Sequence, residues 1–242
     1  MKIIQLNIWG GRLEKQILDL LNRENADIVC LQEAVEIDRG KGSFLVKNLK
    51  EIQKDAGYEY SSFFPQFGFN LMNRQAKMGL AVLSNYPFKK TEAIFTRLEY
   101  VDDFDFLDTD YNIRGFQHVV IEKEGQPLNV INHHGHHLPD HKNGDEETMR
   151  QCKMIVDYIE KLEGSVVLCG DFNLLPDSES IDQINKILVN HVKERDILTT
   201  RTPLTRKTEV CDYIFTSPDI EIKDFQVLDD IVSDHKALSL TF

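Results

Sequence analysis

Polar side chains with catalytic chemistry stand beside several apolar, strand-like runs of this sequence. They are Asn7, Glu33, His133, His134, Asp171, Asn173, Asp234 and His235. Ligand sites in sheet proteins form where loops leave the strands, so these residues are predicted to share one pocket although they are far apart in sequence. Taken alone, each is more often a turn former or a helix cap, and only the set points to function.

The set contains the groups that phosphoryl transfer requires. Carboxylates hold a hard cation, amides orient oxygen atoms, and histidines exchange protons near neutral pH. Attack on phosphorus needs neutralised charge, positioned phosphate oxygens and an activated water, with little covalent chemistry left to the protein. The sequence therefore offers each of the parts that phosphoryl transfer requires.

Apolar runs predict the strands and helices that position these residues. Strands are expected over 2–8, 27–31, 58–64, 79–84, 116–121, 128–133, 166–169, 211–215, 220–227 and 236–242. Helices are expected near 13–21, over 145–162 and over 178–189. The continuously apolar run 27–31 is typical of a strand buried on both faces, and it delivers Glu33 at its exit.

No linker, repeat or low-complexity segment divides the chain, so we expect one domain over residues 1–242. Helices inserted between central strands, together with a strand-rich middle, predict an α/β fold of packed sheets with helices outside.

The composition is that of a globular protein with an acidic surface. Hydrophobic residues make up 41% and charged residues 28% of the chain, which disfavours disorder. The formal net charge is −12, so the overall field repels nucleic acid and anionic lipid unless a local basic patch exists. The first residues lack a secretory cleavage site, and no apolar run approaches the roughly 20 residues that span a bilayer. We therefore expect a cytoplasmic protein without stable membrane association.

Cysteine usage agrees with that compartment. The four cysteines, all at apolar positions, are Cys30, Cys152, Cys169 and Cys211. They are expected to be buried, reduced thiols.

Six short motifs occur in an order that matches a known family. They are NIW at 7–9, LQE at 31–33, NHHG at 132–135, GDFNLLPDSES at 170–180, DYIF at 212–215 and SDH at 233–235. The chain thus resembles the endonuclease/exonuclease/phosphatase superfamily, also called deoxyribonuclease I-like, over essentially its whole length. The resemblance implies an α/β four-layer sandwich of two packed mixed β-sheets flanked by helices.

The same resemblance implies a metal-dependent hydrolase that cleaves phosphodiester or phosphomonoester bonds by in-line attack of an activated water. Glu33 would be the main Mg²⁺ ligand, with Mn²⁺ as a substitute. Asn7 would touch the metal or a phosphate oxygen, and Asp234 would support the metal. Some nucleases of the superfamily carry a second carboxylate where this chain has Trp9, so metal binding near Asn7 is expected to be weaker or single-site.

The catalytic roles follow from the later motifs. Asp171 would orient or deprotonate the attacking water, and Asn173 would bond the oxygens of the pentacoordinate phosphorus. His235 would hold the phosphate or assist proton transfer, kept in the correct tautomer by Asp212. For the middle histidine the family pattern points to His134.

The segment NHHGHH leaves that last choice open among His134, His136 and His137. His133 is predicted to point to the opposite face of its strand and to have a structural role. His136 and His137 are expected to be exposed.

Other interpretations compete with this one. The histidines at 133–141 could form a zinc site, or the chain could be a catalytically inactive binding module of the same fold. It could also be a lipid phosphodiesterase, although the sequence contains no evident lipid-facing aromatic hairpin. Arg114 and Arg150 are candidate phosphate contacts, although packing or solvent-facing arginines are commoner. The basic cluster at 201–207 is expected to be a solvated surface patch.

An acidic stretch at 99–110 bears on the substrate. Its carboxylates would repel a polyanion if the stretch borders the pocket. The predicted partner is a phosphate ester, either a small molecule or a short nucleic acid, in preference to long duplex DNA. The sequence identifies no protein partner.

Overall fold

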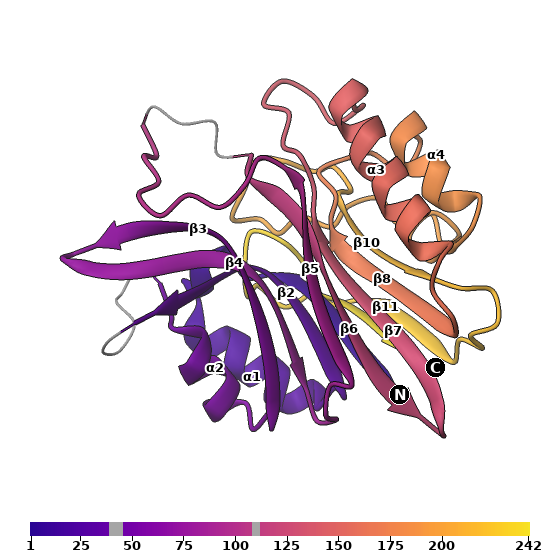
Figure 1. Ribbon diagram of the computed structural model, residues 1–242, viewed down its shortest axis with the longest axis horizontal. Helices are drawn as coiled ribbons and strands as arrows, with labels where there is room; N and C mark the ends of the chain where they lie inside the picture. Colours follow the sequence, from indigo (N-terminus) through magenta and orange to yellow (C-terminus); the bar gives the residue numbers. More distant parts are fainter. Residues whose placement is uncertain (39–45, 108–111) are drawn as a thin grey trace.

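Two mixed β-sheets pack face to face, and a pair of helices covers the outer face of each (Figure 1). The computed structural model describes residues 1–38, 46–107 and 112–242. The order of the layers is helices, sheet, sheet, helices, so the predicted four-layer α/β sandwich is confirmed.

The first sheet has the strand order β11-β12-β1-β2-β4-β3. Its members are β1 (Lys2–Asn7), β2 (Ile28–Ile37), β3 (Tyr60–Leu71), β4 (Arg74–Ser84), β11 (Asp224–Val227) and β12 (Leu238–Thr241). Strands β1 and β2 are parallel, with Asn7 opposite Gln32, whereas the other neighbours are antiparallel. The parallel pair brings the NIW and LQE motifs side by side.

The second sheet has the strand order β5-β6-β7-β8-β10-β9. Its members are β5 (Lys90–Arg97), β6 (Arg114–Lys123), β7 (Gln126–His134), β8 (Ser165–Asp171), β9 (Val189–Asn190) and β10 (Asp212–Thr216). Strands β7 and β8 are parallel and place His134 opposite Asp171, while antiparallel β10 places Asp212 opposite Asp171. Three motifs therefore meet at one end of this sheet.

Helices α1 (Glu14–Glu24) and α2 (Leu49–Asp55) cover the first sheet, and α3 (Glu146–Ile159) and α4 (Glu179–Asn185) cover the second (Figure 1). Helix α1 is amphipathic, because Ile17, Leu20 and Leu21 recur at helical spacing and are all buried. Helix α3 begins with a capping box in which Asp145 and Thr148 bond each other's backbone N–H groups.

Buried amides tie the two sheets together close to the site. The Nδ2 atom of Asn132, on β7, donates to the carbonyl oxygens of Leu31 and Ala81 in the first sheet over 2.9 and 3.0 Å. The Nε2 atom of Gln32 donates to Oδ1 of Asn132 over 2.7 Å. Two further bonds cross between the sheets, from Gln5 to Asp212 and from Gln117 to Ser62. Together these polar contacts fix how the two halves of the site face each other.

Strand β2 departs from the sequence prediction. It does not end before Glu33 but continues to Ile37, and its pairing with β4 shifts by a bulge between Leu31 and Ala34. Glu33 sits in that bulge with φ of 55°. A bulge re-aims a side chain without ending the strand, which apolar patterning alone does not reveal.

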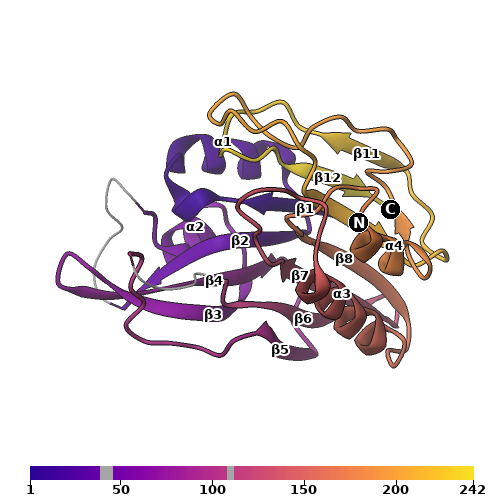
Figure 2. The same cartoon turned by 90° about the horizontal axis from the view of Figure 1, so that it is seen from above.

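The chain ends lie side by side beside the neighbouring strands β1 and β12 (Figure 2), where the backbone N–H of Phe242 donates to the carbonyl of Met1 over 2.8 Å. All four cysteines are buried, as expected. Within the described ranges, no helix combines the length and apolar character needed to cross a membrane.

Candidate active site

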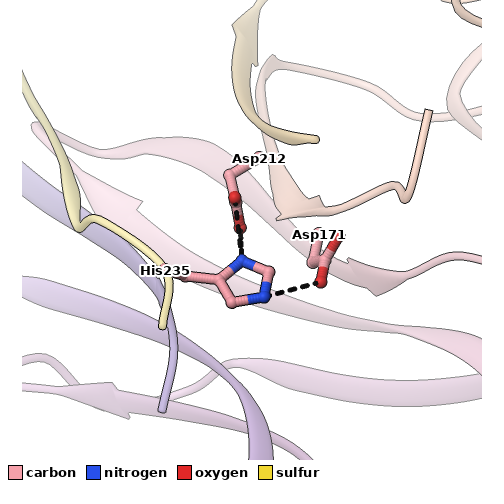
Figure 3. A group of neighbouring side chains, drawn as sticks. All are labelled: Asp171, Asp212 and His235. Atoms are coloured by element: carbon pink, nitrogen blue, oxygen red, sulfur yellow. Dashed lines mark hydrogen bonds and ion pairs between the residues drawn. The ribbon is translucent and has the colours of Figure 1, made fainter. Parts of the chain in front are cut away.

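A histidine–aspartate pair lies at the centre of the site (Figure 3). The Nδ1 atom of His235 is 2.9 and 3.0 Å from the two carboxylate oxygens of Asp212, and both side chains are buried. A carboxylate only accepts hydrogen bonds, so Nδ1 carries the proton and donates a hydrogen bond to Asp212. The structure thus brings into contact the two residues that the sequence analysis paired.

Asp212 is held from two further sides. The hydroxyl of Thr200 donates to one of its carboxylate oxygens over 2.6 Å, and the amide of Gln5 donates to the other over 3.1 Å. Burial disfavours the charged imidazolium of His235, but Asp212 and Asp171 outweigh burial and raise the pKa of His235. The pair therefore makes His235 a stronger base than a free histidine.

Asp171, the last residue of β8, faces the other nitrogen of that histidine. Its Oδ2 lies 3.6 Å from Nε2 of His235 and 3.9 Å from Nε2 of His134. Burial opposes ionisation, but His235, Arg201 and Lys142 hold the pKa of Asp171 well below its usual range. Asp171 is a buried, ionised carboxylate that can accept a hydrogen bond from water.

Asn7 links Asp171 to a second acidic group. Its Nδ2 donates to Oδ2 of Asp171 over 3.2 Å and to Oε1 of Glu33 over 3.1 Å. Its Oδ1 accepts from the backbone N–H of Trp9 over 3.0 Å, which fixes the amide plane. One asparagine therefore sets the separation of two carboxylates that come from different sheets.

Glu33 has the environment of a cation ligand. Burial raises the pKa of Glu33, the amide of Asn7 and the imidazole of His235 oppose that rise, and the nearby carboxylates of Asp234 and Asp171 add to it. Glu33 is half-buried, and the oxygen atoms of Glu33 and Asp234 are hard donors of the kind that Mg²⁺ and Mn²⁺ prefer. The donor types of the predicted ligands thus suit a divalent cation.

The two histidines that end β7 point to opposite sides, as predicted. His134 faces Asp171, and its Nδ1 has no hydrogen-bond partner among the described residues. Burial and the guanidinium of Arg114 hold the pKa of His134 well below its usual value, so its imidazole is neutral. His133 instead places its Nδ1 2.9 Å from the carbonyl oxygen of Gly115, which is a structural contact.

The remaining loop histidines correct the sequence prediction of exposure. His136 is buried, and its backbone N–H donates to Oε1 of Gln151 on α3 over 3.1 Å. His137 is half-buried, and its backbone N–H donates to Oδ1 of Asn112 over 2.7 Å. The loop packs against neighbouring elements, which its polar composition did not suggest.

Asn173 presents its side chain beside a buried lysine that sequence analysis missed. Its backbone N–H donates to Oδ1 of Asp171 over 3.0 Å, and its φ of 56° is one that asparagine tolerates. The Nζ atom of Lys142 donates to Oδ1 of Asn173 over 2.8 Å. Burial lowers the pKa of Lys142, which lies in a loop without a recognisable motif.

Arg201 is a second unpredicted cation of the site. It is buried rather than part of a solvated patch, because its segment pairs with His235 through a β-bridge. Its NH1 contacts Nε2 of His235, and its NH2 donates to Sγ of Cys211 over 3.0 Å. Its guanidinium also lies 3.7 Å from the carboxylate of Asp234. The positive charge of Arg201 therefore contacts both His235 of the histidine–aspartate pair and the carboxylate of Asp234.

The alternative zinc site receives no support from the described part of the chain. There, Asp171, Asp212 and His235 form the one group of three potential ligands whose atoms lie within 4.8 Å of one another. The histidines at 133–141 form no such group. The Nδ1 atom of His235 is already bonded to Asp212, so this group is arranged as a proton-transfer pair and not as a metal cage.

A pocket of about 280 Å³ opens beside Glu33 and His134. Aromatic and apolar side chains make up much of its wall. The lining residues are Trp9, Gly10, Arg12, Glu33, Val46, Gln66, Phe67, Met78, Phe106, Arg114 and His134. Arg114, one of the two phosphate-contact candidates, is thus beside the site, whereas Arg150 pairs with Glu147 on the outside of α3.

The acidic stretch borders this pocket. Val101 forms a β-bridge with Phe67, and the exposed Asp102, Asp103 and Asp105 follow it directly. The expected Asp108 and Asp110 lie outside the described residues. Phe106 and Leu107, which end the described stretch, are also exposed. Negative charge and apolar surface therefore share one rim.

The fold and the site together define a class, namely sandwich proteins with a carboxylate and histidine cluster at one end of two packed sheets. The chain belongs to the endonuclease/exonuclease/phosphatase family, whose model matches residues 4–235. A comparison with curated proteins finds no match.

Solved structures of the same fold agree with this assignment. A family protein from Leptotrichia buccalis has a TM-score of 0.73 at 19% identity, covering 100% of this chain and 99% of that one. The catalytic domain of human Nocturnin with a bound sulfate anion has a TM-score of 0.72 at 15% identity, covering 99% and 92%. A mannosyl-6-phosphatase from Bacteroides thetaiotaomicron has a TM-score of 0.70 at 15% identity, covering 100% and 98%. At these identities the likeness establishes the fold alone.

Proposed function

We propose that the protein is a metal-dependent phosphohydrolase that cleaves phosphodiester or phosphomonoester bonds by in-line attack of an activated water. The observation that carries this proposal is the contact chain from Asp212 through His235 to Asp171, which Asn7 joins to Glu33. This chain of contacts supports the proposal, because it joins an oriented base and an ionised carboxylate to the glutamate proposed to hold the cation.

The side chains divide the reaction among them. Asp171, which is ionised, accepts a hydrogen bond from the attacking water and orients it toward phosphorus. Lys142, Asn173 and neutral His134 donate hydrogen bonds to the phosphate oxygens, on which charge increases in the transition state. His235 binds the phosphate or moves a proton at Nε2, while Asp212 fixes its tautomer.

Glu33 would hold the divalent cation, with Asp234 and Asn7 beside it. When bound, Mg²⁺ neutralises phosphate charge and lowers the pKa of a coordinated water, and Mn²⁺ supplies the same chemistry. Burial, with a smaller contribution from Asp234 and Asp171, raises the pKa of Glu33, and a bound cation would stabilise its charged form.

Charge and size favour a small substrate in a cytoplasmic setting. The acidic rim at Asp102, Asp103 and Asp105 and the net charge of −12 favour a small phosphate ester or a short nucleic acid over long duplex DNA. The sulfate bound to the Nocturnin domain and the phosphatase activity named for the Bacteroides protein support anion binding and phosphate-ester hydrolysis in this fold.

A turnover screen tests the proposal. Phosphomonoesters, phosphodiesters, short single strands and long duplex DNA are incubated with Mg²⁺, with Mn²⁺ or with a chelator. We expect metal-dependent release of product from the small esters and short strands. The proposal fails if activity persists fully in chelator or if no phosphate ester is cleaved with either metal.

Glu33→Gln provides the matched variant, because the amide keeps the size of the side chain and loses its charge. We expect weaker Mg²⁺ binding by calorimetry and unchanged circular dichroism. Glu36→Gln, three residues along β2 and paired with exposed Lys50, is the control and should bind Mg²⁺ as the wild type does. Equal Mg²⁺ affinity in wild type and Glu33→Gln would remove Glu33 from the metal site.

A further inference from the structure

We propose that the pocket beside Glu33 binds one planar heteroaromatic ring of the substrate, so that the substrate is a phosphate ester of nucleotide size. This inference rests on the proposed function, because it places the phosphate of that ester at the catalytic cluster. The pocket and the cluster share Glu33 and His134 as wall residues, so a molecule in the pocket lies next to the reacting groups.

The walls of the pocket are preformed for a flat ring. Phe67 stacks on Phe104 with ring centroids 4.2 Å apart, and Phe106 meets Phe67 edge-on at 5.9 Å. These contacts restrict how the rings turn. Phe106 nevertheless remains 54% exposed, so a ring stacked on it would bury apolar surface that is now in contact with solvent.

Trp9 is another aromatic residue that lines the pocket, and it follows Asn7 by two positions in the sequence. Its φ of 50° is strained for a bulky residue, and the bond from its N–H to Oδ1 of Asn7 holds it there. The guanidinium of Arg12 lies 4.1 Å from the centre of the indole ring. The backbone thus accepts strain to keep an indole and a guanidinium at the pocket, two groups that stack on heteroaromatic rings.

Gln66 favours a heteroaromatic ring over a plain apolar group as the ligand of this pocket. It lines the pocket and is 1% exposed, and its Nε2 has no hydrogen-bond partner within the described residues. A buried amide donor without a partner costs free energy, which an acceptor atom on the ligand would recover. A heteroaromatic edge carries such acceptors, whereas an alkyl chain or a phenyl ring does not.

Size and charge limit the ligand to one such unit. A volume of about 280 Å³ is at the lower end for ligand pockets and suits a single unit of the ligand inside the pocket. Arg12 and Arg114 line the pocket and favour an anionic ligand, while the acidic stretch at its rim opposes a polyanion or an anionic membrane. The chemistry therefore matches a mononucleotide or a terminal nucleotide.

Trp9 is the one tryptophan of the sequence, so its fluorescence reports on the pocket directly. The full-length protein with Mg²⁺ is titrated with the methylene phosphonate analogue of adenosine monophosphate, which is not hydrolysed. Ethyl phosphonate, which lacks the ring, is the matched ligand. We expect saturable quenching by the nucleoside phosphonate and none by ethyl phosphonate.

Two variants locate the binding. Gln66→Leu should weaken binding of the nucleoside phosphonate about tenfold, whereas Tyr86→Ala, which removes an exposed aromatic far from the pocket, should leave it unchanged. Trp9→Phe, measured by equilibrium dialysis, should bind better than Trp9→Ala because phenylalanine retains a stacking face. Circular dichroism excludes variants that fail to fold.

Quenching by ethyl phosphonate as strong as that by the nucleoside phosphonate, or unchanged binding in Gln66→Leu, would overturn the inference. So would a fluorescence shift produced by phosphatidylcholine vesicles and not by the nucleoside phosphonate, which would indicate a lipid surface instead. Because these are binding measurements, the inference can fail while small esters are still hydrolysed, and ring binding can persist in a protein that hydrolyses nothing.

Discussion

Three residues of the site have left-handed backbone conformations, which non-glycine residues rarely adopt. Trp9, Glu33 and Asn173 have φ of 50°, 55° and 56°. Such conformations persist where surrounding contacts compensate for them, and here the bonds of Asn7 and Asp171 do so. Glu33 and Asn173 are motif residues with a proposed role, and Trp9 lies beside them, although other non-glycine residues outside the site also have a positive φ.

At the residue scale, the account predicts that Asp212 acts through His235. Asp212→Asn and His235→Ala should each lower turnover strongly, while the double variant should resemble His235→Ala, because the carboxylate only orients the imidazole and raises its pKa. Steady-state kinetics on the folded fraction measures the cycle. Additive losses, or a loss of stability without loss of turnover in Asp212→Asn, would show that the two residues work independently.

The choice among the loop histidines gives a second prediction. His134→Ala should lower turnover by at least about a hundredfold, the scale of a positioned proton-transfer or hydrogen-bonding group, because His134 faces Asp171. His137→Ala should have a mild effect, since its ring is outside the contact chain. The ranking is read from kcat with both variants under the same Mg²⁺ concentration, and a reversed order would reassign the catalytic histidine.

At the element scale, the sequence predicted the central strands and the two long helices because their apolar periodicity is strong. It did not predict β5 or α2, in which few residues are buried and the pattern is correspondingly weak. The bulge at Glu33 was also missed, because a bulge depends on pairing with β4 rather than on the local sequence. Lys142 and Arg201 lie in loops, so only the tertiary structure brings them to the site.

The amide bridge between the sheets should contribute to stability. Asn132→Leu removes the two hydrogen bonds that its amide donates to the carbonyls of Leu31 and Ala81. The free energy of unfolding, measured with urea, should therefore fall by about 1–3 kcal/mol. Asn22→Leu, on the exposed face of α1, serves as the control and should change little. An unchanged urea midpoint for Asn132→Leu would mean that the other contacts between the sheets suffice to fix them.

A buried histidine beside β10 should make stability depend on pH. Burial, with a further contribution from Arg195, lowers the pKa of His191 to about 4. At a pH between the ordinary histidine pKa and about 4, His191 binds a proton in the unfolded chain but not in the folded protein. The free energy of unfolding therefore has its full value above this pH range and decreases as the pH falls through it. The urea midpoint should drop less between neutral pH and pH about 5 in His191→Gln than in wild type.

Exposed His141 supplies the comparison for that experiment, because His141→Gln should leave the pH dependence of the midpoint as it is in wild type. If His191→Gln loses stability with acid as steeply as wild type, the proton uptake resides in other groups and not at His191.

At the scale of the whole molecule, the site exists only where the two sheets meet. Asn7 and Glu33 come from the first sheet, and His134, Asp171 and Asp212 come from the second. The motifs pointed to these residues, most of which lie at strand ends while Glu33 lies at a bulge within β2. The motifs did not predict the separations of these residues, which depend on the packing of the sheets. In the proposed function, the acidic surface around the pocket, which Arg12 and Arg114 line, would favour small anionic substrates.

The central claim is that water attacks phosphorus with a cation held at Glu33. Hydrolysis of a small phosphate ester in water enriched in heavy oxygen, analysed by mass spectrometry of both products, tests it most directly. The account predicts that one heavy oxygen enters the phosphate product, that none enters the released alcohol, and that incorporation stops in chelator and falls sharply in Glu33→Gln. Heavy oxygen in the alcohol, or equal incorporation without a divalent cation, would contradict it.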